Sequence, residues 1–363
     1  MSNERQSISQ AAAAILSDHS DPEMVRSCED RGWNESLWAT LASSGFTSIA
    51  IPEEDGGSGG SVADACAVIW QIGRHAASVP VAETCLLGGW ALSAAGLPIP
   101  DGPSTSAVGH PSDTVTLHDT GDGWRVDGRV HRVPWGAQAQ RVVLIAGVDG
   151  TDHVVSVDPS LARVEPGRNL AGESRDTLVM EGVPAEVATA PEGVDLQTLR
   201  LRGALARSVS AAGTLDRVRD LTAEYTAARH QFGRPLSAFQ AVQRHIVRIA
   251  EQAVTVGIAA ESAALNSAPN PNPFDVASAK IVAGIAASTA AQASHQAHGA
   301  MGMTKEYELG QLTRRLWSWR DEFGSEREWS IWLGRRVVDS GAPEVWPRIT
   351  LGRSDRADVA AGV

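Results

Sequence analysis

The 363-residue sequence is poor in cysteine, in basic residues and in long apolar runs. Its three cysteines, Cys28, Cys66 and Cys85, form an odd and scattered set, which argues against a disulfide framework or a structural zinc site and suits a reducing compartment. Lys and Arg number 31 against 43 Asp and Glu, giving a net charge of −12, and phosphate backbones repel so acidic a protein. We therefore expect a cytoplasmic protein that does not bind nucleic acid.

No apolar run approaches the roughly 20 residues that cross a membrane. The N-terminus also lacks the basic segment followed by an apolar one that marks a secretory signal. The sequence does have 43% hydrophobic and 20% charged residues, which is the balance of a globular protein with a real core. We expect two or three domains and no membrane partner.

Composition changes along the chain and predicts an α+β multidomain protein. Residues 1–102 are rich in alanine and space their apolar residues as helices do, for example in Glu35–Ser43. Residues 103–192 alternate apolar and polar residues between Gly-Asp and Asp-Gly turns, which is typical of an antiparallel β domain. Residues 193–345 return to long helical stretches joined by short loops, which is typical of a four-helix bundle. Residues 346–363 are expected to form a tail.

One helix-breaking segment, Arg229-His230-Gln231-Phe232-Gly233-Arg234-Pro235, stands out in the helical part of the chain. We expect one helix to end near Gly233, because Pro235 blocks its continuation, and Ser237 to cap the next. Arg229, in the last turn, can hold a phosphate with its forked guanidinium. It can equally complement the negative end of the helix, and spacing alone favours this plainer interpretation.

A second segment, Gln296-Ala297-His298-Gly299-Ala300-Met301-Gly302, follows an alanine-rich stretch. Glycines three apart indicate a close approach of the backbone, although small residues also allow helices to pack. His295 and His298 lie one helical turn apart, but no third ligand falls at a telling spacing. We therefore predict no metal site.

Together with the acidic, glycine-rich loop Ile51–Gly59, these segments resemble the motifs of the acyl-CoA dehydrogenase family, and the order of helical, β and helical domains resembles that family too. Arg229–Gly233 is similar to its Arg-x-x-Phe-Gly motif. Gln296–Gly302 is similar to its Gln-x-x-Gly-Gly-x-Gly motif, with Ala300 in place of the second glycine.

The resemblance implies a flavoprotein that oxidises an acyl-CoA, with FAD held between the β domain of one subunit and the helical bundle of another. It assigns Arg229 to the pyrophosphate of the neighbour's FAD, Phe232 to the adenine end and Gln296 to a hydrogen bond nearby. Gln231 and Gly299, in the same motifs, belong to the same cofactor site. In this family a glutamate removes the α-proton of the thioester while the flavin accepts the β-hydride.

The sequence departs from the family where this chemistry takes place. By resemblance, the base position falls on Phe323 or, as in a minority of members, near Gly203, and neither residue accepts a proton. Glu322 is adjacent, but a step of one residue rotates a side chain by about 100° in a helix. Where an indole should flank the flavin stands Arg132, and Pro134 offers the flavin neither an N–H nor a hydroxyl.

The chain thus keeps the half of an FAD site that serves a neighbour and lacks the half that would serve itself. This asymmetry resembles the base-lacking subunit of actinobacterial heterotetrameric acyl-CoA dehydrogenases, which act on CoA thioesters of bulky substrates such as steroid side chains. We predict a heteromeric enzyme formed with a homologous subunit; whether an electron-transfer flavoprotein receives the electrons stays open. Two alternatives also stay open: a self-sufficient enzyme with Glu322 as a relocated base, and a structural or oxygenase relative of the fold.

Tryptophan is abundant, with 11 residues against 2 Tyr and 5 Phe. A cluster near the C-terminus comprises Trp317, Trp319, Trp329, Trp332 and Trp346. We expect these rings to pack against a neighbouring helix or subunit rather than to bind a ligand.

Overall fold

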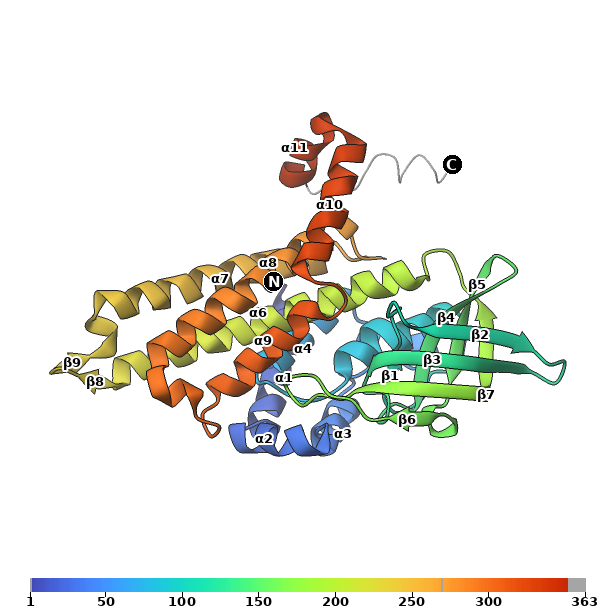
Figure 1. Cartoon of the computed structure of the whole chain (residues 1–363), viewed down its shortest axis with the longest axis horizontal. Helices are drawn as coiled ribbons and strands as arrows, with labels where there is room; N and C mark the ends of the chain where they lie inside the picture. Colours follow the sequence, from blue (N-terminus) through green and yellow to red (C-terminus); the bar gives the residue numbers. More distant parts are fainter. Residues whose placement is uncertain (1, 269, 352–363) are drawn as a thin grey trace.

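Two helical regions and a twisted sheet make up the computed structural model, which describes residues 2–268 and 270–351 (Figure 1). The sheet lies at one end of the molecule, and the long helices of the C-terminal half extend away from it, with the N-terminal helices along their side. The expected α+β organisation, with a helical, a β and a second helical part, is confirmed.

The N-terminal part is helical, as its alanine-rich pattern predicts. Its elements are α1 (Asn3–His19), α2 (Pro22–Arg31), α3 (Glu35–Ser43), η1 (Glu53–Asp55), α4 (Val62–Arg74), the π-helix η2 (Glu83–Gly88) and α5 (Gly89–Ala94). The start of α4 is fixed by a capping box, in which the Ser61 hydroxyl accepts from the Asp64 N–H and the Asp64 carboxylate accepts from the Ser61 N–H.

The middle part is a seven-stranded sheet with the order β1-β4-β5-β7-β3-β2, and β6 pairs with β7. The strands are β1 (Ser104–Ser106), β2 (Thr114–Asp119), β3 (Trp124–Pro134), β4 (Arg141–Val148), β5 (Thr151–Val157), β6 (Arg163–Glu165) and β7 (Arg175–Thr189), with η3 (Pro159–Leu161) before β6. The expected antiparallel pairing holds except that β1 runs parallel to β4. The pairing of β3 with β7 slips between Val130 and Val133, which leaves Arg132 in an irregular stretch with φ 55°.

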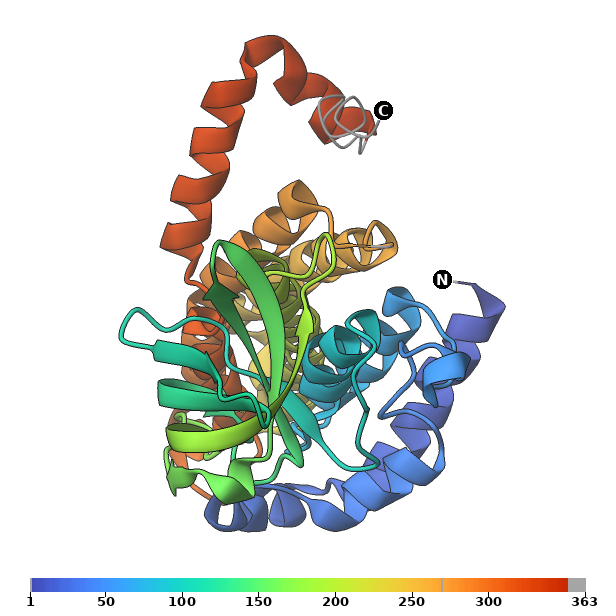
Figure 2. The same cartoon turned by 90° about the vertical axis from the view of Figure 1, so that its right-hand side faces the viewer.

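The C-terminal part is a four-helix bundle that continues into a projecting helical arm. The bundle consists of α6 (Leu196–Ala228), α7 (Gln240–Leu265), α8 (Pro273–His298) and α9 (Leu309–Asp321), with η5 (Gly299–Met303) between the last two. The arm consists of α10 (Glu326–Ser340) and α11 (Ala342–Leu351), and Figure 2 shows it standing away from the body of the protein. Residues 273–303 are long and apolar enough to cross a membrane, which the sequence reading did not anticipate, but α8 packs against α6, α7 and α9 as a core helix.

The boundary between the first two bundle helices differs from expectation. α6 ends at Ala228 rather than near Gly233, and the next residues form a small hairpin of β8 (His230–Gln231) and β9 (Arg234–Pro235). Ser237 lies in the turn η4 (Leu236–Ala238) and does not cap α7, whose N-cap position is Phe239. A helix continued through Pro235 would lose a backbone hydrogen bond there, because proline has no N–H. The hairpin instead pairs the backbone of its two short strands. The tail expected from residue 346 begins inside α11, and its remainder lies outside the described residues.

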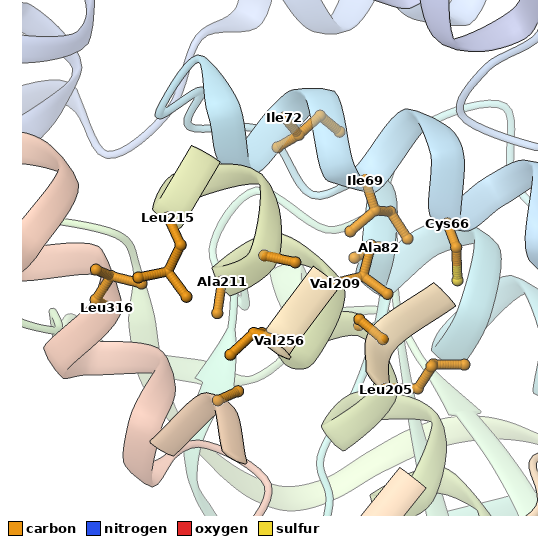
Figure 3. Close-up of a cluster of buried hydrophobic side chains, with 14 of the residues drawn as sticks. Cys66, Ile69, Ile72, Ala82, Leu205, Val209, Ala211, Leu215, Val256 and Leu316 are labelled. Atoms are coloured by element: carbon orange, nitrogen blue, oxygen red, sulfur yellow. The ribbon is translucent and has the colours of Figure 1, made fainter. Parts of the chain in front are cut away.

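The N-terminal helices and the bundle share one hydrophobic core, which Figure 3 shows at the meeting point of α4, α6, α7 and α9. Glycine lets α4 and α6 touch: a Cβ at Gly73 would lie 2.1 Å from the Ser210 carbonyl oxygen, and one at Gly213 would lie 1.9 Å from the Trp70 oxygen. This close contact fixes α6, which carries residues of the candidate site, against the N-terminal part.

A buried lysine holds the end of α9. The Lys280 amine, on α8, donates to the carbonyl oxygens of Trp319 and Arg320 at 2.7 Å each. These are carbonyls at the C-terminus of α9, which lack partners inside their own helix. Burial lowers the pKa of the Lys280 amine to about 7, since the interior disfavours its charged form.

We expect Lys280 to make stability depend on pH. Above pH 7 the folded chain releases the Lys280 proton while the unfolded chain keeps it to about pH 10, so the unfolded state binds more protons and stability rises with pH. In Lys280→Met, the slope of unfolding free energy between pH 7 and 8.5 should fall by about 1 kcal/mol per pH unit, as measured by urea denaturation. An unchanged slope would contradict the assignment.

Candidate functional site

The bundle end formed by β8 and β9 exposes groups that find no partner among the described residues. Arg229 caps the C-terminus of α6 with extended backbone. Its side chain is exposed, and within the described residues its guanidinium makes no hydrogen bond or ion pair. The plainer interpretation, a guanidinium complementing its own helix end, is therefore not supported by a direct contact, and the group is available to an anion outside the chain.

Phe232 occupies the tip of this hairpin in a strained conformation. It has φ 53° and Gly233 has φ 77°, the pair of positive values that a two-residue hairpin turn requires. A bulky residue in this region costs about 1–2 kcal/mol, yet the Phe232 ring is 91% exposed. The ring contacts Phe239 edge-on, with centroids 6.2 Å apart. Strain combined with an exposed aromatic ring is a feature of binding sites rather than of folding.

The second motif reaches the same end of the bundle. Tyr225, in the last turn of α6, stacks on His298 at the end of α8, with ring centroids 4.5 Å apart, and donates its hydroxyl to the His298 carbonyl oxygen at 3.3 Å. This contact brings the hairpin and the segment containing Gln296 and Gly299 together. Gln231, Gln296 and Gly299 are all exposed. A forked cation, an exposed ring and two amides suit the phosphates and adenine of a dinucleotide.

A cleft between sheet and bundle is the place where the chain could hold its own flavin ring. It contains a cavity of about 360 Å³. Its lining includes Ser106, His110, His131, Arg132, Pro134, Arg175, Arg200, Asp321, Glu322, Phe323 and Glu328. The side chains of this lining decide whether the cleft can hold a flavin ring and supply a base.

Glu322 lies at the base of this cleft, bound by two arginines. Arg175 on β7 grips it with both arms, Nε to Oε1 at 2.8 Å and Nη2 to Oε2 at 2.9 Å, and Arg207 on α6 donates from Nε at 2.7 Å. Burial alone would raise the pKa of the Glu322 carboxyl, but the two guanidinium groups outweigh it and hold that pKa well below its usual range. Glu322 is therefore a permanently ionised structural carboxylate, which counts against its use as a relocated base.

The network around Glu322 joins all three parts of the chain. Glu83 on η2 binds Arg207 at 2.5 Å, and Glu173 before β7 binds Arg175 at 2.9 Å. Arg315 on α9 approaches Glu173 at 3.6 Å. These groups are buried, and their positive and negative charges balance. Sequence reasoning missed the network; its one signal was charged residues such as Arg207 within the apolar stretch of α6.

The two base positions of the family meet in space and hold no acid. Phe323 follows α9 with φ 57°, and a Cβ at Gly203 on α6 would lie 2.2 Å from the Phe323 ring. The ring thus fills the space that a side chain at position 203 would need. The Phe323 carbonyl oxygen accepts from the Trp329 indole at 3.0 Å, which anchors the turn.

The sheet side of the cleft also fits a flavin ring poorly. Arg132 is exposed on the irregular part of β3, and Pro134 is buried without an N–H to donate. Deeper in, Arg202 stacks on the Trp90 ring, 3.7 Å from its centroid, and fills space between α5 and α6. Ser106 is the exception, since its buried hydroxyl has no partner in the described part of the chain and faces the cavity lining. Neither of the two base positions expected from the family motifs holds an acid, and the sheet side of the cleft does not suit an isoalloxazine ring.

Two histidine groups bear on the prediction of no metal site. His110, Asp113 and His131 lie close enough to share an ion. However, Asp113 Oδ1 already accepts from the ring and backbone of His131 at 2.9 and 2.8 Å. His131 Nε2 accepts from Arg129, so both nitrogens of His131 and one oxygen of Asp113 already have partners within the chain. In the pair considered from the sequence, one nitrogen of each ring is engaged, His295 Nε2 with Thr313 and His298 Nδ1 with the Ser294 carbonyl oxygen. The other nitrogen of each ring is buried without a partner among the described residues.

The tryptophan cluster divides between core and surface. Trp319 and Trp329 are buried, and the Trp319 indole donates to Glu173 at 3.0 Å. Trp329 and Trp332 contact edge to face at 5.4 Å. Trp317 and Trp346 are exposed. The expected packing against neighbouring helices therefore describes Trp319, Trp329 and Trp332 but not the two exposed rings.

We expect Glu322→Gln to destabilise the protein by about 3–5 kcal/mol, because it leaves the buried cluster, in which Glu173 and Glu83 still pair with Arg175 and Arg207, with one uncompensated positive charge. Glu328→Gln is the matched control, because that residue is exposed and glutamine can keep its capping role. Loss of the Glu328 charge should lower the free energy of unfolding by less than about 1 kcal/mol. Urea denaturation measures both. Equal stability of the two variants would contradict the structural role of Glu322.

Phe232→Asn should leave the isolated chain at least as stable as the wild type, because the ring is exposed and asparagine tolerates a positive φ, which relieves about 1 kcal/mol of strain. Ala substitution at buried Leu215 is the contrast, with an expected loss of about 2–5 kcal/mol. Thermal and urea denaturation test this. A clear destabilisation by Phe232→Asn would show that the ring supports folding rather than binding.

Comparison with known proteins identifies the family. The model of the acyl-CoA dehydrogenase N-terminal domain matches residues 2–98, and that of the acyl-CoA dehydrogenase C-terminal domain matches residues 195–325. Acyl-CoA dehydrogenase IpdE2 of Mycobacterium tuberculosis is 31% identical over 310 residues, covering 84% of this chain and 88% of that protein.

Solved structures share the fold. The ChsE4-ChsE5 complex from Mycobacterium tuberculosis matches with a TM-score of 0.87 at 24% identity, covering 94% of this chain and 99% of that one. The steroid ACAD Tcur3481-Tcur3483 matches with a TM-score of 0.84 at 23% identity, covering 93% and 98%. The chain belongs to the acyl-CoA dehydrogenase family of FAD-dependent oxidoreductases.

Proposed function

We propose that this chain is the base-lacking subunit of a heteromeric, FAD-dependent acyl-CoA dehydrogenase. It contributes its bundle end to the FAD of a homologous partner subunit and does not run the reaction in its own cleft. The observation that carries this proposal is the contrast between the two regions. At the bundle end, Arg229 and Phe232 are exposed and able to contact a ligand. In the cleft, Phe323 occupies a position where the reaction needs a base, and Glu322 is bound by arginines.

The residues of the bundle end have distinct roles toward the cofactor. Arg229 would hold the pyrophosphate, since a guanidinium fork matches phosphate oxygens. Phe232 would cover the adenine end, and Gln231, Gln296 and Gly299 would supply amide and backbone contacts beside it. When bound, FAD supplies the ring that accepts a hydride from the acyl group. This chain orients the cofactor's nucleotide half and excludes water from it, while the partner supplies the base.

The names of the related structures support a proposal for the substrate and the assembly. The ChsE4-ChsE5 structure is a complex of two proteins, and Tcur3481-Tcur3483 is a steroid ACAD. These relatives support a CoA thioester of a bulky acyl group, such as a steroid side chain, as the substrate of the assembled enzyme. We further propose that the complex is heterotetrameric and cytoplasmic, and that an electron-transfer flavoprotein reoxidises it.

A self-sufficient enzyme with Glu322 as a relocated base is the alternative expected from the sequence, and the two arginines bound to Glu322 count against that residue. Its neighbour Asp321 is another carboxylate beside the cleft. Asp321 is exposed, ends α9 and lines the mouth of the cavity. It lies in solvent rather than in the apolar setting that tunes a catalytic carboxyl. Activity of the chain alone that is lost in Asp321→Asn would favour this alternative over the heteromer.

We expect the purified chain alone to retain no stoichiometric FAD, and the complex with a homologous subunit encoded beside it to hold one FAD per pair of chains. Arg229→Gln should release most of that flavin, because the pyrophosphate loses its forked cation. Arg125→Gln, at an exposed arginine on the distant sheet, should release none. Flavin absorbance and native mass spectrometry measure the ratio.

Two results would overturn the proposal. One is a chain that by itself binds one FAD and desaturates an acyl-CoA. The other is a complex whose flavin content is the same with Arg229→Gln as with Arg125→Gln.

A further inference from the structure

The two tyrosines of the chain both contact one buried histidine. Tyr225, in the last turn of α6, stacks on His298 with an interplanar angle of 21°. Tyr307, in the loop before α9, lies 5.2 Å from the His298 ring, centroid to centroid, and meets the Tyr225 ring edge-on at 6.0 Å. His298 is the last residue of α8 and is buried. Its ring therefore joins three segments at the end of the bundle that lies away from the sheet (Figure 1).

The two ring nitrogens of His298 have different surroundings. Nδ1 lies 2.8 Å from the Ser294 carbonyl oxygen. Because a carbonyl oxygen only accepts, Nδ1 carries the proton of the neutral ring. Nε2 is buried and has no hydrogen-bond partner among the described residues. A second proton, on Nε2, would be buried without an acceptor, so this site fits the neutral ring and not the charged one.

The titratable groups around His298 do not favour its charged form. Burial outweighs the hydrogen bond to Ser294 and lowers the pKa of His298 from its ordinary value of 6.5. Among the described residues, the titratable groups that face the ring are Tyr225, Tyr307 and His295. Burial raises the pKa of Tyr307 to about 12, so its phenol stays neutral. A charge on His295, one turn earlier on α8, would oppose a charge on His298.

The charged residues behind the stack are paired with each other. Arg217 on α6 donates to both carboxylate oxygens of Glu308, the N-cap residue of α9, at 2.8 Å each. Glu224, also on α6, lies 3.6 Å from the same guanidinium. These charges bear on Tyr307 rather than on His298.

The stack is connected to Arg229 through one turn of backbone. The Arg229 N–H donates to the Tyr225 carbonyl oxygen at 2.9 Å, where α6 ends and the hairpin begins. On the other side, the Tyr225 hydroxyl donates to the His298 carbonyl oxygen at 3.3 Å. Gly299 follows His298 directly, and Gln296 precedes it by two residues. Displacement of the His298 ring would therefore shift these two binding segments relative to each other.

We propose that His298 is a positioning residue that holds the hairpin carrying Arg229 against the segment of Gln296 and Gly299, and that only its neutral form does so. A proton on Nε2 would drive the ring from between the tyrosines. The displaced ring binds a proton more tightly than the stacked ring, so the contact is complete above a pH of about 6.5 and is lost as the pH falls below it. The inference rests on the proposed function only for its consequence, which is weaker retention of the partner's flavin.

The isolated chain tests this positioning without a cofactor. At a pH of about 7.5, amide hydrogens of residues 222–236 should exchange faster in His298→Ala than in the wild type, because the last turn of α6 loses its stacking partner. His298→Phe should exchange as slowly as the wild type, since a flat ring keeps the stack. At a pH of about 5 the wild type should exchange as fast as His298→Ala, and His298→Phe should stay slow. Mass spectrometry compares the three proteins at each pH, with peptides of β4 as the internal reference.

The complex with the homologous subunit tests the consequence for flavin. The wild type should release flavin faster below a pH of about 6.5, by up to about tenfold per pH unit for one linked proton. His298→Phe should lose this pH dependence, and His298→Ala should release flavin quickly at every pH. His295→Phe is the matched control, because burial also lowers the pKa of His295 but its ring contacts Thr313 on α9. It should keep the wild-type pH profile. Flavin fluorescence after dilution measures the release rate.

The outcomes separate this inference from the proposed function. Equal exchange of residues 222–236 in wild type and His298→Ala overturns the positioning role. A wild-type pH profile in His298→Phe, or loss of that profile in His295→Phe, overturns the role of the His298 proton. A complex without flavin, in which the exchange differences persist, contradicts the proposed function and still supports the role of His298.

Discussion

The buried carboxylate of Glu322 is the group on which the arrangement of this molecule depends. An ion inside a protein is stable only when opposite charges replace the water it has lost. Arg175 from the sheet and Arg207 from the bundle do so, and Glu83 ties the N-terminal part to the same cluster. The geometry of this cluster fixes the three parts relative to each other. It also occupies the base of the cleft between sheet and bundle.

The bundle end shows the opposite physical state. The charges around Glu322 are paired, whereas among the described residues the Arg229 guanidinium has no partner and Phe232 is exposed on a strained turn. Folding alone does not favour either feature, because a strained aromatic ring in water contributes nothing to the core. Such features persist when an external ligand or subunit stabilises them. One chain thus combines a charge-paired cluster in its interior with an exposed cation and an exposed aromatic ring at the end of its bundle.

Local sequence patterns predict most of the helices, strands and the fold class. The predictions that were wrong concern the end of one helix and the apolar character of another. The helix Glu35–Ser43 and the fold class were readable because apolar spacing and capping act over a few residues. The end of α6 was placed too late, since hairpin pairing between Gln231 and Arg234 prevailed over helix propagation. The membrane-length apolar character of α8 was missed because alanine, dispersed among polar residues, does not look like a continuous hydrophobic run.

The sequence by itself determined the helical and β segments, the family motifs and the absence of an acid at positions 203 and 323, because each is a property of residue identity at a given place in the chain. Only the tertiary structure decided the role of Glu322, whose partner Arg175 lies 147 residues away, and the availability of Arg229. Pairing, burial and exposure depend on which distant segments meet, and no short-range pattern encodes that meeting.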